Sequence, residues 1–306
     1  MDVHLANPRG FCAGVERAIE IVERALERYG APIYVRHEIV HNAVVVEDLR
    51  AKGAIFVDDV GAVPEGAWLV FSAHGVPPQV VQQAEDRGCR VVDATCPLVT
   101  KVHVEARWLA EQGYTILLIG HRSHVEVDGV IGEAPDHTIV LENAREAELV
   151  EVPDPDKVAV LTQTTLSVDE ARVVQDVLRR RYPALRVPRK DDICYATQNR
   201  QDAVKRLSAD VDLLLVIGDP TSSNSNRLRE LGETRGIESH LVLGPEEIDP
   251  AWLEGRRSIG ITSGASTPEV SVQRVVDFLR ARGAANLLAL DGPREDMVFS
   301  MPPGLR

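Results

Sequence analysis

The sequence predicts an α/β protein made of three repeats, each built around a small parallel sheet. Cys12, Cys96 and Cys194 each follow a turn-like stretch and immediately precede an amphipathic helical pattern. Behind each cysteine, at similar offsets, two short apolar runs end in polar clusters that lead into further helical patterns. Such near-continuous apolar runs are typical of buried parallel strands, and ligands bind beyond the carboxyl ends of these strands.

The polar residues at the ends of the apolar runs form one set in each repeat. A single spacing match is weak, because alternation of strands and helices gives roughly this period by itself. Agreement among three repeats, each opened by a cysteine, predicts equivalent positions in the fold. The sets are Cys12 with His41 and His74, Cys96 with His124 and Thr164, and Cys194 with Asn224 and Ser266.

The same repeats predict the domain organisation. The first α/β repeat is expected over residues 14–96, with Cys96 at its end, and the second over 97–191. The third is expected over 192–282 together with 1–13, which has the pattern of a strand able to pair with the third sheet. Residues 283–306 show less pattern and are expected to form a C-terminal extension.

Composition excludes several classes of function. The chain has 306 residues, of which 44% are hydrophobic and 26% charged, as in ordinary globular proteins. A net charge of −13 and only 4% aromatic residues argue against a nucleic-acid partner. No apolar run is long enough for a membrane span, and no secretory signal is visible. Four cysteines in such a chain indicate a reducing cytoplasm rather than a disulfide scaffold.

The residues alone leave three interpretations of the cysteines open. Free cysteine is often a small buried hydrophobe, and Cys89, which lies outside the repeat, fits that interpretation. Structural zinc sites usually contain close CxxC pairs, which this chain lacks. Single cysteines at helix starts, where the helix dipole stabilises a thiolate, suit an iron–sulfur cluster held between domains. Three such cysteines would leave the fourth iron of a cubane cluster without a thiolate.

The histidines and the segment TSSNSN predict a pocket for phosphate groups. Imidazole serves as a hydrogen-bond donor and partial cation, while a Ser/Asn run at a helix start offers hydroxyl, amide and backbone N–H groups. The alternatives are structural histidines and an ordinary helix cap. Neither GxxxxGK[ST] nor GxGxxG occurs. The expected set is His41, His74, His124, Ser222, Ser223, Asn224 and Ser266.

Glu126, in HRSHVEVDG, is the candidate proton donor. A buried carboxylic acid with a raised pKa can deliver protons, whereas the alternative is a solvated loop glutamate. Thr164 or Thr165 is expected to relay the proton or to position a substrate hydroxyl.

A basic run contrasts with the acidic chain as a whole. Its composition is typical of a solvated helix C-terminus, and the second hypothesis is a docking patch for an acidic electron carrier near Cys194. The run comprises Arg179, Arg180, Arg181, Arg186, Arg189 and Lys190.

Together these motifs resemble the 4-hydroxy-3-methylbut-2-enyl diphosphate reductase (IspH/LytB) family. The resemblance extends from the N-terminus to about residue 280 with nearly colinear spacing. Val125 stands where the family pattern has proline, and Asp219-Pro220-Thr221 replaces a more basic or polar stretch. The matching segments are NPRGFCAGV, VVHN, FSAHGV, DATCPLVTKVH, GHRSHVEVDG, TQTTLSVD, RKDDICYAT, SSNSNRL and GAS-P, written as they stand here.

The resemblance implies three α/β domains in a pseudo-threefold arrangement around a central [4Fe-4S] cluster with three cysteine ligands and one open iron. It implies reductive removal of the substrate hydroxyl to give isopentenyl and dimethylallyl diphosphate in the cytoplasm, with ferredoxin or flavodoxin as electron donor. It assigns Cys12, Cys96 and Cys194 as cluster ligands. Glu126, Thr164 and His124 are the implied catalytic residues, and His41, His74, His124, Thr164, Ser222, Ser223, Asn224 and Ser266 the implied substrate-binding residues.

Two other functions remain alternatives on chemistry alone. A non-redox dehydratase also uses a cubane cluster with an open iron, but it would need no electron donor. An iron–sulfur sensor would need an exposed cluster and a partner-binding surface rather than convergent polar residues suited to a diphosphate.

Overall fold

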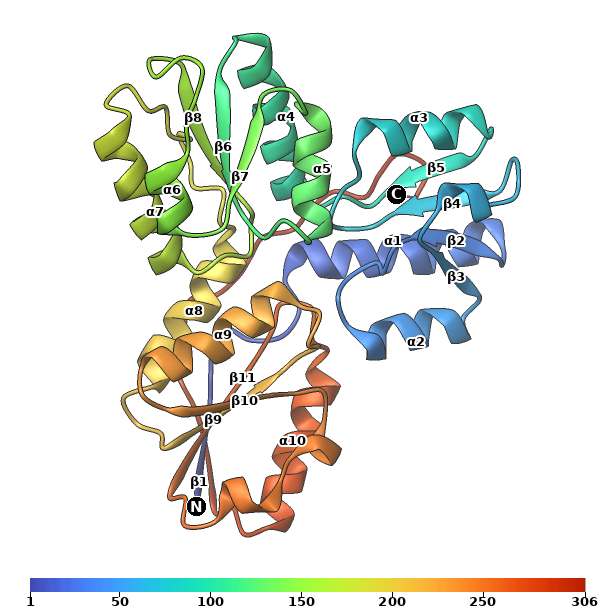
Figure 1. Cartoon of the computed structure of the whole chain (residues 1–306). Helices are drawn as coiled ribbons and strands as arrows, with labels where there is room; N and C mark the ends of the chain where they lie inside the picture. Colours follow the sequence, from blue (N-terminus) through green and yellow to red (C-terminus); the bar gives the residue numbers. More distant parts are fainter. Residues whose placement is uncertain (306) are drawn as a thin grey trace. The chain divides into compact units, whose positions relative to one another are not determined.

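The computed structural model describes residues 1–305, which divide into two compact units. The strand pairs in this part of the chain are parallel, so the predicted α/β class with three parallel sheets is confirmed (Figure 1). Unit 1 contains Met1–Val15, His41–Val45 and Tyr195–Val298, and unit 2 contains Glu16–Val40, Val46–Cys194 and a final segment that begins at Phe299.

Unit 1 is built on a five-stranded sheet in the order β10-β9-β11-β1-β12. Alternate residues of β9 face opposite sides, as the strand period of two requires: Leu213 and Leu215 pack against helix α10, whereas Leu214 packs against α8 and α9. The elements are β1 (Asp2–Leu5), α8 (Tyr195–Leu207), β9 (Leu213–Ile217), α9 (Ser223–Thr234), β10 (Glu238–Val242), β11 (Ser258–Ser263), α10 (Glu269–Ala281), β12 (Asn286–Ala289) and the 3₁₀ helices Pro245–Glu247 and Pro250–Leu253.

The two ends of the chain enter this sheet side by side. Strand β1 pairs with β11, which confirms that the N-terminal strand joins the third sheet. On its other edge β1 pairs with β12, which lies inside the region expected to be an extension with little pattern. The extension therefore contributes a strand, and the domain bounds given above stay predictions.

Unit 2 contains two smaller sheets. The first has the order β3-β2-β4-β5, and Leu69 and Phe71 of β4 pack with Ala84 of helix α3 on one of its faces. Its elements are α1 (Ala13–Tyr29, of which Ala13–Val15 belongs to unit 1), β2 (Ile33–Arg36), α2 (Ala43–Ala51, which begins in unit 1), β3 (Ala54–Val57), the 3₁₀ helix Val60–Ala62, β4 (Trp68–Phe71), α3 (Pro78–Asp86) and β5 (Arg90–Asp93).

The second sheet of unit 2 has the order β7-β6-β8 and is covered on both faces. Leu117 and Ile119 of β6 pack with helices α6 and α7, while Ile116 and Leu118 pack with α4 and α5. The elements are α4 (Pro97–Glu111), β6 (Thr115–Ile119), α5 (Val125–Glu133), β7 (Thr138–Leu141), α6 (Ala144–Leu149), β8 (Val158–Thr162) and α7 (Val168–Arg181).

Each sheet has one pair of neighbouring parallel strands from which the chain continues toward opposite edges of the sheet. These pairs are β2/β4, β6/β8 and β9/β11, and in parallel sheets the crevice beyond such a pair is where ligands bind. The repeats thus put their polar residues at equivalent points of the topology. His41 and His74 follow the first pair, His124 and Thr164 the second, and Asn224 and Ser266 the third.

Two glycines bring helix α9 close to the strand ends at the third of these points. A Cβ on Gly218 or Gly264 would lie 2.2 Å or 2.1 Å from the Oγ of Ser225 in the first turn of α9. Any larger residue would push the helix away from the ends of β9 and β11. Glycine therefore lets the positive end of the α9 dipole sit at the carboxyl edge of the sheet.

None of the helices within residues 1–305 combines the length and the hydropathy needed to cross a membrane.

Candidate active site

Glu126 lies in the first turn of helix α5, beyond the end of β6. His124 caps this helix, since its ring Nδ1 accepts a hydrogen bond from the Glu126 amide at 3.2 Å. The glutamate is only 2% exposed. The Thr164 amide donates to its Oε1 at 2.6 Å, and the Thr164 hydroxyl donates to its Oε2 at 3.0 Å. The structure thus places the candidate proton donor in direct contact with its expected partner.

Burial makes Glu126 an acid suited to neutral pH. It raises the pKa of this carboxyl to about 7, although the two hydrogen bonds from Thr164 act in the opposite direction. The negative charge of Asp192 adds to the increase. Because a group with such a pKa is substantially protonated near pH 7, it can donate a proton and then be reprotonated. The solvated-loop alternative for this residue is wrong.

Asp192 is a buried carboxylate that the sequence interpretation missed. It accepts a hydrogen bond from the Thr162 amide at 3.0 Å and pairs with Lys101 Nζ at 2.8 Å. Burial raises the pKa of Asp192 to about 6, although Lys101 opposes the change. Asp192 thus ties the segment before Cys194 to the end of β8, and the Cys194 amide also donates to the Thr164 carbonyl at 3.1 Å. Its place in RKDDICYAT, two residues before a repeat cysteine, was the available signal.

Two predicted phosphate ligands of unit 2 lie side by side. The rings of His74 and His124 meet edge to face with centroids 6.0 Å apart. Both residues are half-buried, and the Ser72 hydroxyl lies 3.3 Å from Nδ1 of His74. Two adjacent imidazoles can donate hydrogen bonds to the same anionic group. This arrangement fits a phosphate better than isolated structural histidines.

In unit 1 the start of helix α9 gathers the other polar residues. Ser222 caps the helix by accepting a hydrogen bond from the Ser225 amide at 3.3 Å. Asn224 Oδ1 accepts from the Ala265 amide at 3.0 Å, and the Cys12 amide donates to the Ala265 carbonyl at 3.2 Å. The helix N-terminus, with Ser223 half-buried as its first residue, is thereby tied to the turn after β11 and to the cysteine loop. A helix start of this kind favours an anion.

The His41 segment is fastened to the same part of unit 1. The Ser266 hydroxyl donates to the His41 carbonyl at 2.9 Å, and Asp219 Oδ2 accepts from the Ala43 amide at 2.9 Å. Burial acts to raise the pKa of Asp219, but hydrogen bonds from Thr221 and Ala43 and the charge of His41 hold it below its usual value. Asp219, in the sequence only a departure from the family pattern, is therefore an ionised anchor for the His41 loop.

The three repeat cysteines each stand at the beginning of a helix. Cys12 directly precedes α1, Cys96 is the N-cap of α4, and Cys194 directly precedes α8. All three are half-buried, as is Cys89, which follows helix α3 rather than opening a helix. The helix-start prediction is therefore confirmed for each of the three.

The surroundings of Cys12 can be described in detail. Burial raises the pKa of its thiol, while the charge of Arg200 and the backbone N–H groups of Val15 and Gly14 lower it. Backbone donors of this kind are what stabilise the sulfur ligands of iron–sulfur clusters, so the residues present fit such a group. Within residues 1–305, no three His, Cys, Asp or Glu side chains come close enough together to hold a single metal ion.

Half of the basic run is engaged inside unit 2. Arg179 pairs with Asp176 at 3.0 Å, Arg181 donates to the Ala147 carbonyl at 2.5 Å, and Arg186 stacks on the Trp108 ring at 4.4 Å. These contacts favour the interpretation of a solvated helix C-terminus over that of a dedicated docking patch.

Comparison with known proteins places the chain in a family. The sequence model of the LytB protein family matches residues 3–280. The chain belongs to the LytB family. It is 56% identical over 305 residues to the 4-hydroxy-3-methylbut-2-enyl diphosphate reductase of Ralstonia nicotianae, covering 100% of this chain and 94% of that protein. The protein of the same name from an Azoarcus species is 55% identical, with 100% and 98% covered.

Solved structures agree with this LytB assignment. The E-1-hydroxy-2-methyl-but-2-enyl-4-diphosphate reductase of Plasmodium falciparum is similar with a TM-score of 0.97 and 39% identity, covering 99% of this chain and 96% of that one. A second structure, of the (E)-4-hydroxy-3-methyl-but-2-enyl diphosphate reductase described as the terminal enzyme of the non-mevalonate pathway, has a TM-score of 0.63 and 30% identity, with 92% and 100% covered.

Proposed function

We propose that this chain reduces 4-hydroxy-3-methylbut-2-enyl diphosphate, the activity named for its LytB relatives. The reaction consumes two electrons and two protons, breaks the carbon–oxygen bond of the hydroxyl, and yields isopentenyl or dimethylallyl diphosphate plus water. It is the terminal step of the non-mevalonate pathway in the structurally similar reductase.

The observation that carries this proposal is the contact between Glu126 and Thr164. The departing hydroxyl needs a proton, and a buried carboxyl with a pKa of about 7 is a suitable donor. The Thr164 hydroxyl, 3.0 Å from Oε2, is placed to hold the substrate hydroxyl and to pass the proton on. His124, which caps the same helix, orients this pair through the Glu126 amide.

The proposed cofactor is a [4Fe-4S] cluster with three cysteine ligands. Cys12, Cys96 and Cys194 would hold it, since each stands at the start of a helix and single cysteines so placed suit such a cluster. A bound cluster supplies the electrons and one Lewis-acidic iron that carries no cysteine. The hydroxyl, amide and imidazole donors that follow the strand ends suit a small anionic substrate, which supports the reductase over a sensor.

The proposed diphosphate ligands are hydroxyl, amide, imidazole and backbone N–H donors that follow the strands named above. In unit 1 these are the start of helix α9 and the loop anchored by Asp219, and in unit 2 the adjacent imidazoles of His74 and His124. Such donors neutralise charge without a nucleotide-binding motif. The proposed set is His41, His74, His124, Thr164, Ser222, Ser223, Asn224 and Ser266.

We propose a ferredoxin or flavodoxin as electron donor and a reducing cytoplasm as the location, since the proposed cluster needs reduced thiols. The exposed members of the basic run, such as Arg180 and Arg189, are the remaining candidates for a docking contact with an acidic carrier. Charge reversal at these positions should slow reduction by ferredoxin at low salt, and unchanged kinetics would remove the docking role.

The direct test is an anaerobic assay of reconstituted protein with the allylic diphosphate and reduced methyl viologen. The proposal predicts dye oxidation matched to formation of the two isoprenoid diphosphates, and no turnover without the dye. C12S should lose bound iron and activity, whereas C89S, the matched control outside the repeat, should keep both. Turnover without a reductant would favour a dehydratase, and no consumption of the allylic diphosphate by protein that retains its four-iron cluster would overturn the assignment.

A further inference from the structure

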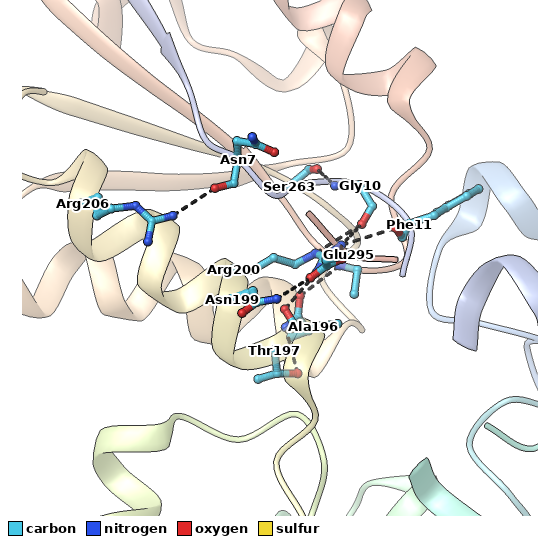
Figure 2. A network of polar contacts seen from close by, with 12 residues as sticks. Asn7, Gly10, Phe11, Ala196, Thr197, Asn199, Arg200, Arg206, Ser263 and Glu295 are labelled. Atoms are coloured by element: carbon cyan, nitrogen blue, oxygen red, sulfur yellow. Dashed lines mark hydrogen bonds and ion pairs between the residues drawn. The ribbon is translucent and has the colours of Figure 1, made fainter. Parts of the chain in front are cut away.

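Unit 1 contains a buried ion pair that the proposed reaction does not use. Arg200, on helix α8, is fully buried, and Glu295, in the segment after β12, has a side chain only 13% exposed. Arg200 Nη1 lies 3.0 Å from Glu295 Oε1, and Nη2 lies 3.2 Å from Oε2, so the pair is bidentate. Asn199 Nδ2 donates to Glu295 Oε1 as well, at 3.0 Å. Figure 2 shows these side chains converging on the loop before Cys12.

Arg200 also donates from Nη1 to the Ala196 carbonyl of its own helix at 2.9 Å, and its other donors hold that loop. Its Nη2 and Nε donate to the Gly10 carbonyl at 2.7 Å and 3.2 Å, and Nη2 also reaches the Phe11 carbonyl at 3.4 Å. On the other side of the loop, the Gly10 amide donates to Ser263 Oγ at 2.8 Å. Gly10 has a φ of 72°, in the left-handed region, so this turn favours glycine. The backbone that leads into Cys12 is thus fixed from two sides.

The segment that carries Glu295 is pressed against the same loop. The Leu290 amide donates to the Leu5 carbonyl at 2.9 Å, continuing the pairing of β12 with β1. A Cβ on Gly292 would lie 2.0 Å from the Asn7 carbonyl oxygen, so only glycine allows this approach. Gly292 and Glu295 therefore contact the cysteine loop or the arginine that holds it, although the sequence marks these residues only as part of an extension.

We propose that Arg200 and Glu295 are positioning residues for Cys12, with the C-terminal segment acting as a clamp on the loop Asn7–Phe11. Glu295 balances the buried charge of Arg200 and fixes its plane, so that its other N–H groups meet the Gly10 and Phe11 carbonyls. Without the carboxylate, the guanidinium is left buried and uncompensated and the loop loses its fixed geometry. The inference rests on the proposed function only where it says that Cys12 holds a cluster.

The first test needs neither cluster nor substrate. Hydrogen–deuterium exchange of the apo-protein should show that E295A accelerates exchange of the Gly10 and Cys12 amides by about tenfold or more, while β9 stays protected. E295Q keeps an acceptor for Arg200 and should restore part of the protection. G292A disturbs the clamp without changing charge and should act in the same direction. E246A, which breaks the half-exposed pair between Glu246 and Arg274 in the same unit, is the matched control and should leave the loop unchanged.

The second test examines the proposed role of Cys12 as a cluster ligand. Reconstituted E295A should release iron to a chelator about fivefold faster than wild type or E246A, and its reduced cluster should give a broadened electron paramagnetic resonance signal. The KM for the diphosphate should stay within about twofold, because α9 is held by other contacts.

Wild-type exchange in the loop for both E295A and G292A would overturn the clamp, as would an equal loss of protection throughout unit 1. Iron release by E295A at the wild-type rate would remove the role toward Cys12. If the wild-type protein did not reduce the diphosphate, the proposed function would fail, while the exchange experiment would still decide on the clamp.

Discussion

The segments that follow β6/β8 in unit 2 and β9/β11 in unit 1 occupy the same point of the sheet topology but differ in chemistry. The first contains a buried carboxyl, Glu126, whose pKa is raised to about 7 by burial and which meets Thr164 directly. The second contains neutral donors at a helix start, with Asn224 tied to the turn after β11. Sheet topology thus sets where polar residues gather, while a few residues set the chemistry proposed for each place, proton donation in the first and anion binding in the second.

The largest effect on kcat is expected from substitution of Glu126. E126Q keeps the shape of the side chain and an acceptor for the Thr164 amide, but it cannot donate the proton. Loss of a positioned general acid should lower kcat about 10²- to 10⁴-fold with little change in KM. Steady-state assays with reduced methyl viologen measure both constants, and E111Q, which alters an exposed glutamate of unit 2, is the control. A kcat within tenfold of wild type would remove the acid role from Glu126.

A substitution at the start of helix α9 in unit 1 is expected to change KM rather than kcat. N224D places a negative charge at the helix start that we propose to bind the diphosphate. Repulsion should raise KM by about 10- to 100-fold and change kcat much less. Q273E adds the same charge to an exposed position on α10 and should behave like wild type. If N224D lowered kcat and left KM unchanged, anion binding would have to be assigned elsewhere.

The raised pKa of Glu126 also predicts a dependence of stability on pH. Since the pKa of about 7 in the folded state exceeds the ordinary 4.5, the folded protein binds more protons than the unfolded chain between these values. The free energy of unfolding must therefore fall as pH rises through this window and level off above it.

E126Q removes this term. The free energy of unfolding of the variant, taken relative to that of wild type, should therefore rise by about 2–3 kcal/mol between pH 4.5 and pH 8, as measured by urea unfolding. Asp192, which is raised to about 6 by burial, acts with the same sign in both proteins and largely cancels in the difference. Parallel pH profiles for the two proteins would mean that the pKa of Glu126 is the same in the folded protein as in the unfolded chain.

The smallest effect concerns the anchor of the His41 loop. D219A removes the acceptor for the Ala43 amide, and loss of such a cap should raise KM about three- to tenfold. D219N keeps a carbonyl acceptor and should change KM less than about twofold. Equal effects from both variants would show that the charge of Asp219, rather than its hydrogen bond, is what matters.

The class of fold could be predicted from the sequence because the spacing of the repeat follows the order of strands and helices. Apolar runs that end in polar residues predicted parallel strands, and His74, His124 and Thr164 follow the strands at which the chain reverses its direction through the sheet. The pairing of the N-terminal strand with the third sheet was predictable for the same reason.

Long-range pairings were not predictable from pattern. The apolar run in β12 is short and its side chains are exposed, so it lacks the alternation that marks a half-buried strand. Glu295 lies in a stretch of ordinary loop composition, and only folding brings it to Arg200. Asp192 likewise acquires its raised pKa from burial, a property that residue type and spacing do not record.

Titration of the Glu126 carboxyl itself decides whether this residue can be the proton donor. Infrared difference spectra of the apo-protein, with E126Q as the reference, isolate the carbonyl band of the protonated acid as pH is varied. We expect a midpoint of about 7, because the buried carboxyl in contact with Thr164 resists ionisation. A midpoint near the ordinary 4.5 would contradict this expectation, since the group would then be ionised and unable to donate a proton at neutral pH.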